Sequence, residues 1–514
     1  MRVHPWFILL ASLAPVSAAT AQPALGRISF PTSGIPAAQP EFIRGVLLLH
    51  SFQYAEAAEA FRAAQRLDPG FAMAYWGEAL THTHQVWNQQ DLPAARAVLA
   101  RLGPTPAARQ ARAPTQRERD YLGSVELLYG DGTKPGRDTL YTKALESLVE
   151  ANPNDDEAKV FYSVALLGLS QGIRNIPTYM KAGAIAQDVF RHNDDHPGAA
   201  HFIIHAFDDP VHAPLGLYAA SRYSVIAPGA AHAQHMTTHI FLALGMWDDV
   251  VKQNEVAAGP VPPRWRPGHY TNWLLYGYLQ QGRFDDAKRL LGVLAENATS
   301  AGGRGQLANI RTRYVLETER WDSPEARAVA ADTAVAGEDG YEYASYGGGI
   351  AALKRGDRAT AVALLAGLEQ RHHDQITTVK PGDPGSRVVP VILAWSLEAE
   401  ILASDGKLAE AVSLFQRAAA LEDGMPEEFG PPAVVTPSHE SLGRLYLLAG
   451  KPADAVREFE RALELGPGRS RPLIGLIRAA KQAGPASLVA RATASLRRNW
   501  HLADPDVTTL LSNP

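Results

Sequence analysis

Residues 436–467 read TPSHESLGRLYLLAGKPADAVREFERALELGP, a pattern typical of two amphipathic helices joined by a tight turn. Apolar residues recur at helical spacing on both sides of Gly450, and Pro467 ends the unit. Small residues mark the places where helices approach closely: Gly443, Ala455 and Ala462. A hairpin of this kind cannot bury its apolar face alone, so it must stack on copies of itself.

Copies of the pattern occur along most of the chain. Residues 42–69 repeat it, residues 395–418 repeat it again, and looser copies surround Gly282, Gly356 and Gly484. We count nine or ten hairpins between Glu41 and Trp500, so the sequence predicts an all-α fold, a superhelical solenoid of antiparallel helix hairpins. With Thr436 as position 1, the marker residues fall at positions 7, 8, 11, 15, 20, 24, 27 and 32, a spacing that resembles the tetratricopeptide repeat (TPR) family.

The chain divides into four predicted segments. Residues 1–21 combine one Arg, an apolar run and the triplet Ala19-Thr20-Ala21, which indicates a secretory signal peptide. Residues 22–40 are expected to form an extended leader, residues 41–300 an N-terminal TPR-like superhelix with a histidine-rich groove, and residues 301–514 a C-terminal TPR-like superhelix. The predicted localisation is therefore periplasmic or secreted.

Composition excludes several classes of partner and site. The net charge of −5 and the lack of a basic block argue against nucleic acid. The sequence contains no cysteine, so disulfides and thiolate metal ligands are excluded. After signal cleavage we expect no transmembrane segment, because no later stretch is long and apolar enough.

Histidines concentrate in two short stretches. Residues 196–209 read HPGAAHFIIHAFDD and residues 232–240 read HAQHMTTHI, and eight of the 17 histidines lie between His192 and His239. His201 and His205 are four residues apart on one helix, and His235 and His239 follow 34 residues later on the equivalent helix. Because equivalent helices of stacked repeats are neighbours, both pairs should face one space, with His232 one turn behind.

Converging imidazoles without sulfur predict a transition metal site, with Zn, Cu, Ni or Fe as the admissible ions. The predicted metal ligands are His201, His205, His232, His235 and His239. The two stretches also resemble a TPR group of exported bacterial proteins with motifs like HPGAxHxxIH and HxxHMPxHI, in which Thr237 here replaces a proline. That resemblance supports the site and implies no reaction.

Two other readings of the groove stay open at the level of sequence. In the TPR family, positions 2, 5 and 9 of the first helix line a ligand groove, and His269, Asn272 and Tyr276 would continue this row and hold the carboxylate of a peptide or protein partner. Alternatively, the histidines hydrogen-bond one another and the backbone without any ligand.

Acidic residues near the histidines are candidate catalytic groups. Glu78 and His82 lie four residues apart in a stretch that also contains His84, and Asp208 directly follows the first histidine pair. A carboxylate beside a metal can act as a general base. The sequence does not establish whether residues 78–84 join the histidines, and the other motifs of common enzymes are absent.

The function predicted first is an exported TPR-repeat protein that binds a transition metal through its histidine cluster, with metal-dependent hydrolase or oxidase activity as its enzymatic form. The alternative is a non-catalytic TPR scaffold that binds a peptide or protein partner in the groove. Whether the protein is an enzyme is left open by the sequence.

Overall fold

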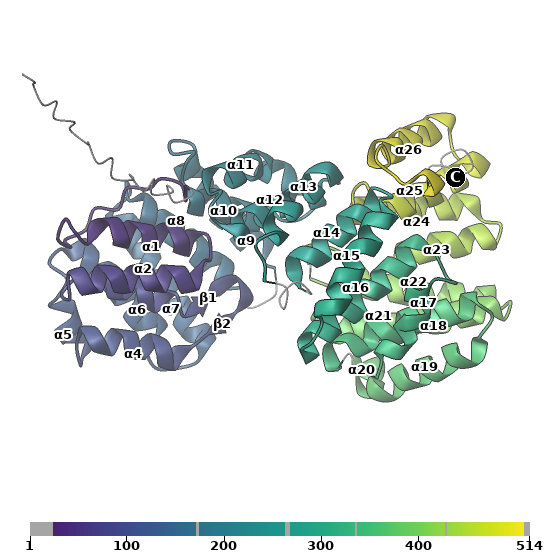
Figure 1. Cartoon of the computed structure of the whole chain (residues 1–514), viewed down its shortest axis with the longest axis horizontal. Helices are drawn as coiled ribbons and strands as arrows, with labels where there is room; N and C mark the ends of the chain where they lie inside the picture. The colour runs from purple at the N-terminus through teal and green to yellow at the C-terminus, as the bar shows by residue number, and fades with distance from the viewer. Residues whose placement is uncertain (1–23, 171–173, 263–267, 335–336, 427–428, 508–514) are drawn as a thin grey trace, which may run out of the picture.

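The computed structural model of the chain describes residues 24–170, 174–262, 268–334, 337–426 and 429–507. These residues form an elongated all-α solenoid of two lobes joined through α10–α13 (Figure 1). Successive helices pair as antiparallel hairpins, six in each half of the chain, with one additional short helix in each half. The fold class predicted from the 436–467 pattern is therefore confirmed, and several hairpins without that pattern raise the number of hairpins above the nine or ten expected.

The first half contains thirteen helices, and a small β-hairpin interrupts them after α3. The helices are α1 (Gln39–His50), α2 (Tyr54–Leu67), α3 (Ala72–Leu80), α4 (Leu92–Leu102), α5 (Pro106–Gln110), α6 (Gln116–Leu128), α7 (Lys134–Ala151), α8 (Asp156–Gly168), α9 (Ile176–Phe190), α10 (Pro197–Ala206), α11 (Ala213–Ile226), α12 (Ala231–Ala243) and α13 (Trp247–Ala258). Strands β1 (Thr83–His84) and β2 (Gln89–Gln90) pair antiparallel around a 3-10 turn, η1 (Gln85–Trp87).

The second half contains the other thirteen helices. They are α14 (His269–Gln280), α15 (Phe284–Asn297), α16 (Ala301–Thr318), α17 (Pro324–Asp332), α18 (Glu338–Lys354), α19 (Arg358–Arg371), α20 (His373–Thr378), α21 (Gly385–Ser404), α22 (Leu408–Asp423), α23 (Ser438–Leu448), α24 (Pro452–Leu465), α25 (Ser470–Ala483) and α26 (Ala486–Asn499). None of the helices among the described residues is long and apolar enough to cross a membrane.

Stacking of the hairpins depends on a ring held between two glycines. The ring of Phe61 on α2 lies so close to Gly45 of α1 and Gly77 of α3 that an added Cβ would approach it to 2.6 Å and 2.4 Å. The same arrangement recurs near the end of the chain, where Phe459 lies between Gly443 and Gly475. This close approach explains why the repeat pattern requires glycine and a large apolar residue at a fixed spacing.

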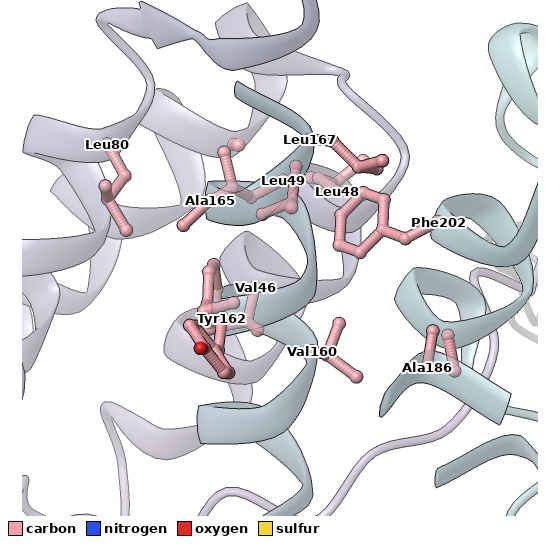
Figure 2. Packing of buried hydrophobic residues seen from close by; sticks show 14 of the residues in the cluster. Val46, Leu48, Leu49, Leu80, Val160, Tyr162, Ala165, Leu167, Ala186 and Phe202 are labelled. Carbon is pink, nitrogen blue, oxygen red and sulfur yellow. The ribbon is translucent and has the colours of Figure 1, made fainter. Parts of the chain in front are cut away.

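Two hydrophobic cores run through the solenoid. The first core consists of buried residues between Phe30 and Val250 together with Tyr276. The second consists of buried residues between Val251 and Val507. In the first core, side chains from α1, α8 and α10 meet, among them Leu48, Leu167 and Phe202 (Figure 2). The two cores thus meet at α13, whereas the sequence predicts a boundary between superhelices near residue 300.

The last hairpins of the chain contact helices near its middle, α13 and α14. The indole of Trp247 donates a hydrogen bond of 2.9 Å to the carbonyl of Gly468. Arg469 donates to the hydroxyl of Tyr276 at 2.6 Å, and Ser470 donates to the carbonyl of Gln280 at 2.6 Å. The final hairpins therefore pack against α13 and α14, where Figure 1 shows α25 close to α14.

The predicted signal peptide, residues 1–21, lies outside the described residues. Residues 24–38 form no helix; their first residues contact the loops of the α9–α12 region, and residues from Phe30 on contact the α1–α6 region before α1 begins at Gln39. The amide of Arg27 donates to the carbonyl of Asp195, and the carbonyl of Ala24 accepts from Gly229. Phe30 is buried against Trp76 and other rings of the first core, so this leader is part of the folded structure.

We expect Gly77→Ala to destabilise the protein by about 1–3 kcal/mol, because its new methyl group would overlap the Phe61 ring in a packed core. Urea unfolding of the two proteins measures the difference. Gly292→Ala in α15 is the matched control, because nothing lies within 4 Å of its added Cβ, and it should stabilise the helix by up to about 1 kcal/mol. Equal effects of the two substitutions would contradict the packing argument.

Candidate metal centre

The five predicted histidines are all buried and lie on two neighbouring helices. His201 and His205 project from α10, and His232, His235 and His239 project from α12. Together with His269, the first residue of α14, they form two groups of three in which one ligand atom from each residue lies within 4.8 Å of the others. We call His201, His205 and His232 the first triad, and His235, His239 and His269 the second triad.

Both triads have the same construction. Each consists of a pair four residues apart on one helix and a histidine from the first turn of the next equivalent helix. The sequence predicted that the two pairs would share one space, and the structure places them side by side, with the rings of His205 and His239 6.1 Å apart. His232 does not stand behind the pairs, because its ring reaches back to His201, with the two Nε2 atoms 3.2 Å apart.

Hydrogen bonds determine the tautomers of the second triad. The Nδ1–H of His239 donates to the carboxylate of Asp208 at 2.5 Å, and the Nδ1–H of His235 donates to the amide oxygen of Asn254 at 2.8 Å. The side-chain nitrogen of Asn254 donates to the carbonyl of Val250, which fixes the orientation of that amide. Since a carboxylate and an amide oxygen can only accept, each ring donates its Nδ1 proton to them, and in its neutral form each carries its lone pair on Nε2.

These two lone pairs face each other. The Nε2 atoms of His235 and His239 lie 3.1 Å apart in a buried space. When both rings are neutral, two bare acceptors at that distance repel unless a proton or a metal ion lies between them. In a tetrahedral site with metal–nitrogen bonds of about 2.0–2.1 Å, two ligand nitrogens are about 3.3 Å apart. The observed separation is therefore close to one edge of such a coordination sphere.

The first triad is oriented in the same way. The Nδ1–H of His201 donates to the backbone carbonyl of His50 at 2.6 Å, which leaves the Nε2 lone pair of His201 directed toward His232. The Nε2 atom of His205 is buried and makes no hydrogen bond to any described residue. A buried nitrogen without a partner is costly, so this atom also favours a ligand that the histidines share.

Burial keeps four of the triad imidazoles neutral at neutral pH. Burial, reinforced by the neighbouring histidines, lowers the pKa of His201, His205, His232 and His235 well below 6.5. Neutral imidazole is the form that binds metals, because protonation removes the lone pair.

Aromatic rings cover both triads and limit the access of water. Phe52, which follows α1, lies 4.3 Å from His201 and 5.5 Å from His232, measured between ring centroids. Trp273 of α14 lies 4.3 Å from His239 and 4.9 Å from His235. An apolar shell of this kind raises the strength of electrostatic interactions at the site.

A cavity of about 630 Å³ borders one histidine of each triad, His232 and His269. Its other lining residues are Phe52, Gln53, Tyr54, His84, Trp87, Gln89, Val261, Gly268, Tyr270 and Thr271. His269 is exposed toward solvent, whereas the other five triad histidines are buried. The cavity therefore gives the triads their access to small molecules.

A third group contains His50, Glu157 and His196, and the carboxylate of Glu157 contacts both histidines. His50 Nε2 lies 2.7 Å from one carboxylate oxygen of Glu157, and His196 Nε2 lies 3.2 Å from the other. Nδ1 of His196 accepts from the amide of Ala199, so its proton lies on the Nε2 that faces Glu157. Burial alone would raise the pKa of Glu157, but the two histidines outweigh it and lower the pKa to about 2. This group connects α1, α8 and α10 and so positions the His50 carbonyl.

The predicted groove residues have separate environments. His84 lines the cavity and stacks on Tyr54 at 3.9 Å, so part of the 78–84 segment does join the histidines. His82 belongs to the same β-hairpin turn and is not among the cavity-lining residues. Asn272 lies one turn beyond His269, with the oxygen of its side chain buried and without a hydrogen bond to a described residue. Tyr276 is buried and held by Arg469.

The two candidate acids have different partners. The carboxylate of Glu78 is enclosed by Arg62 at 2.7 Å, by Gln65 at 2.7 Å and by Arg101, which occupies its oxygens away from the triads. Asp208 contacts the second triad through Nδ1 of His239. Its position is that of a group that orients a ligand histidine.

Three contributors to the site were not identified from the sequence. Asn254 and the carbonyl of His50 orient triad histidines, and Phe52 covers the first triad. His269 was identified as a groove residue and not as a ligand. The sequence did contain a signal for a ligand role. His269 follows His235 by 34 residues and, like His232, lies at the start of a helix.

Stability of the metal-free protein should fall as the pH drops below about 6.5, because unfolding exposes histidines whose folded pKa values are lowered. Each such histidine changes the free energy of unfolding by about 1.4 kcal/mol per pH unit, over the pH range in which its imidazole is protonated in the unfolded chain and neutral in the folded one. Denaturant unfolding at a series of pH values measures this slope. His205→Gln should reduce the slope, and an unchanged slope would show that His205 does not titrate in this way.

Comparisons with known proteins agree with the all-α repeat fold. Residues 44–109 match the family model described as tetratricopeptide repeat. A comparison with curated proteins gives no match. Solved structures with a similar fold include a monomeric mutant of IFIT1 with Gppp-AAAA, at 14% identity over 83% of this chain and 90% of that one, with a TM-score of 0.40.

Two other similar structures are the APC/C hetero-tetramer Cut9-Hcn1 and yeast Tom70. Each is 12% identical to this chain, with TM-scores of 0.30 and 0.27; they cover 93% and 94% of this chain and 96% of their own chains. At this level of similarity the likeness concerns helical repeat architecture and carries no argument about ligands. The matched segment, residues 44–109, supports the tetratricopeptide repeat family for the hairpins of α1–α5.

Proposed function

We propose that this protein binds two transition metal ions, one in each histidine triad. The observation that carries the proposal is the pair of Nε2 lone pairs of His235 and His239, which face each other at 3.1 Å while acceptors hold both Nδ1 protons. A shared cation turns this repulsive arrangement into a favourable one. The first triad repeats the arrangement with His201, whose Nδ1 is held by the carbonyl of His50.

Two ions explain the site better than one. Each triad supplies three nitrogens that are close enough for a single coordination sphere. Among the described residues, the histidines gather into these two groups of three, each with its ligand atoms within 4.8 Å of one another. Three protein ligands leave one or more positions open on each ion, as in catalytic metal sites.

The donor set restricts the metal. Imidazole nitrogen without sulfur suits Zn²⁺, Cu²⁺, Ni²⁺ and Fe²⁺, whereas Ca²⁺ and Mg²⁺ require oxygen ligands. The open positions would face the cavity beside His232 and His269, which supports a metal-dependent hydrolase or oxidase. The apolar run and small-residue triplet of residues 1–21 support export to the periplasm or beyond.

Burial argues against the alternative of a peptide groove at this position. A peptide carboxylate would need accessible charged or amide groups, but five of the triad histidines are buried, and Tyr276 is held by Arg469. Internal hydrogen bonding accounts for the second triad only when one of its rings is protonated, because neutral His235 and His239 with these Nδ1 partners have no Nε2 proton to share.

Protein purified without a histidine tag should contain two equivalents of transition metal, measured by elemental analysis. We expect His201→Ala and His235→Ala each to lose about one equivalent, because each substitution removes a ligand from one triad. His439→Ala is the matched control, because His439 is paired with Glu458 and Asp423 far along the chain and should keep both ions. Protein that contains no metal and takes up none of the four ions would overturn the proposal.

The substitution Asp208→Asn tests the orientation of His239. The amide is nearly isosteric but no longer stabilises the Nδ1 proton as a carboxylate does, so the affinity of the second triad should fall by about 10–100-fold. Competition with a chromogenic chelator measures the affinity of each site. Asp209→Asn is the control, since Asp209 pairs with Arg174 and His212 and should leave the affinity unchanged. An equal loss in both variants would contradict the role of Asp208.

A further inference from the structure

The cavity beside the triads has walls of an unusual composition. Among the described residues, twelve line this cavity, and none of these twelve is an aspartate, glutamate, lysine or arginine. Four aromatic residues, Phe52, Tyr54, Trp87 and Tyr270, line it together with three histidines, and Gln53 and Gln89 add neutral amides. A volume of about 630 Å³ lies within the range of small-molecule sites. The walls therefore suit a small uncharged molecule rather than a peptide chain or an ion.

The rings of one wall hold one another in place. Tyr54 stacks on His84 at 3.9 Å and on Phe52 at 5.4 Å, measured between ring centroids. Trp87 lies against Phe52 at 5.3 Å and against His232 of the first triad at 6.0 Å. Flat ring surfaces fixed in this way favour a planar aromatic ligand, which makes offset-stacked or edge contacts with them.

Charge balance indicates which functional group the ligand of this cavity should carry. If each triad holds a divalent ion, as proposed above, the six imidazoles neutralise none of that charge. Among the described residues, Asp208 supplies the carboxylate that contacts a triad histidine, and Asp209 is already paired with Arg174. A positive charge left in a largely buried site favours a ligand that becomes an anion there, and it disfavours a cation in the aromatic cavity.

The geometry points to a small phenolic compound as the ligand of this cavity, an inference that rests on the proposed metal centre. The ring stacks against the wall of Phe52, Tyr54 and Trp87 and the hydroxyl reaches the metal ions beside His232 and His269. With ions held by the triads, the hydroxyl would lose its proton to solvent, and the ions would supply the positive charge that stabilises the phenolate. The ions make this ionisation favourable because they lower the pKa of an oxygen ligand.

The probe is 4-nitrophenol, because its absorption spectrum differs between the phenol and the phenolate. Added to the metal-loaded protein at a pH where the free probe is neutral, it should show the phenolate spectrum in a saturable manner. Metal-free protein should not produce that spectrum. The ether 4-nitroanisole, which has the same ring and no hydroxyl, should compete only weakly.

Variants of the wall separate stacking from metal binding. Trp87→Ala and Tyr54→Ala should weaken the affinity for 4-nitrophenol about fivefold to tenfold through the loss of ring contacts, while elemental analysis still finds both ions. Trp395→Ala is the matched control, because Trp395 of α21 lies under Arg417 in the second half of the chain and should leave the affinity unchanged.

The outcomes distinguish this inference from the metal proposal. Two bound ions without a phenolate spectrum would overturn the phenolic ligand and leave the metal centre in place. Equal binding of 4-nitroanisole, or of 4-nitrophenol by metal-free protein, would also overturn the metal-bound hydroxyl. Absence of metal uptake would overturn both. Wall variants that bind the probe as tightly as the unchanged protein would contradict the stacking surface.

Discussion

The structure depends on the fixed offset between one helical hairpin and the next. Large rings such as Phe61 enter the space left by glycines on both neighbouring helices, so successive hairpins can stack in one register only. That register places the paired histidines of one helix beside the first turn of the next equivalent helix. It does so twice, for α10 with α12 and for α12 with α14, and the two triads are therefore copies of one arrangement.

Groups behind the triads orient the histidines that this register brings together. The His50 carbonyl, the Asn254 amide and the Asp208 carboxylate each accept one Nδ1 proton, and each comes from a different element. These contacts direct the Nε2 atoms of His201, His235 and His239 into a largely buried space, and in the proposed metal centre a cation there would stabilise the arrangement. Metal binding and stability are expected to be coupled here, because an ion that binds the folded state stabilises it.

The histidine register illustrates what could be inferred without coordinates. A separation of 34 residues placed His205 beside His239 correctly, since the repeat period and the helical period are both visible in the chain. The same reasoning put His232 behind the pairs, but its ring reaches His201 and completes a triad. Glu78 shared a helical face with His82, yet Arg62 and Arg101 from neighbouring helices occupy its carboxylate. Pairings between distant helices have no signature in local spacing.

The sequence by itself determined the all-α repeat architecture and the convergence of the histidines, because both follow from periodicities carried by neighbouring residues. Tertiary structure alone decided how six histidines divide into two triads, which nitrogen of each ring carries the proton, and which aromatic residues enclose the adjoining cavity. These features join α1, the β1–β2 hairpin, α10, α12 and α14. The physical reason is that hydrogen bonds and ring contacts depend on distances of a few ångströms between segments far apart in the chain, which no local pattern encodes.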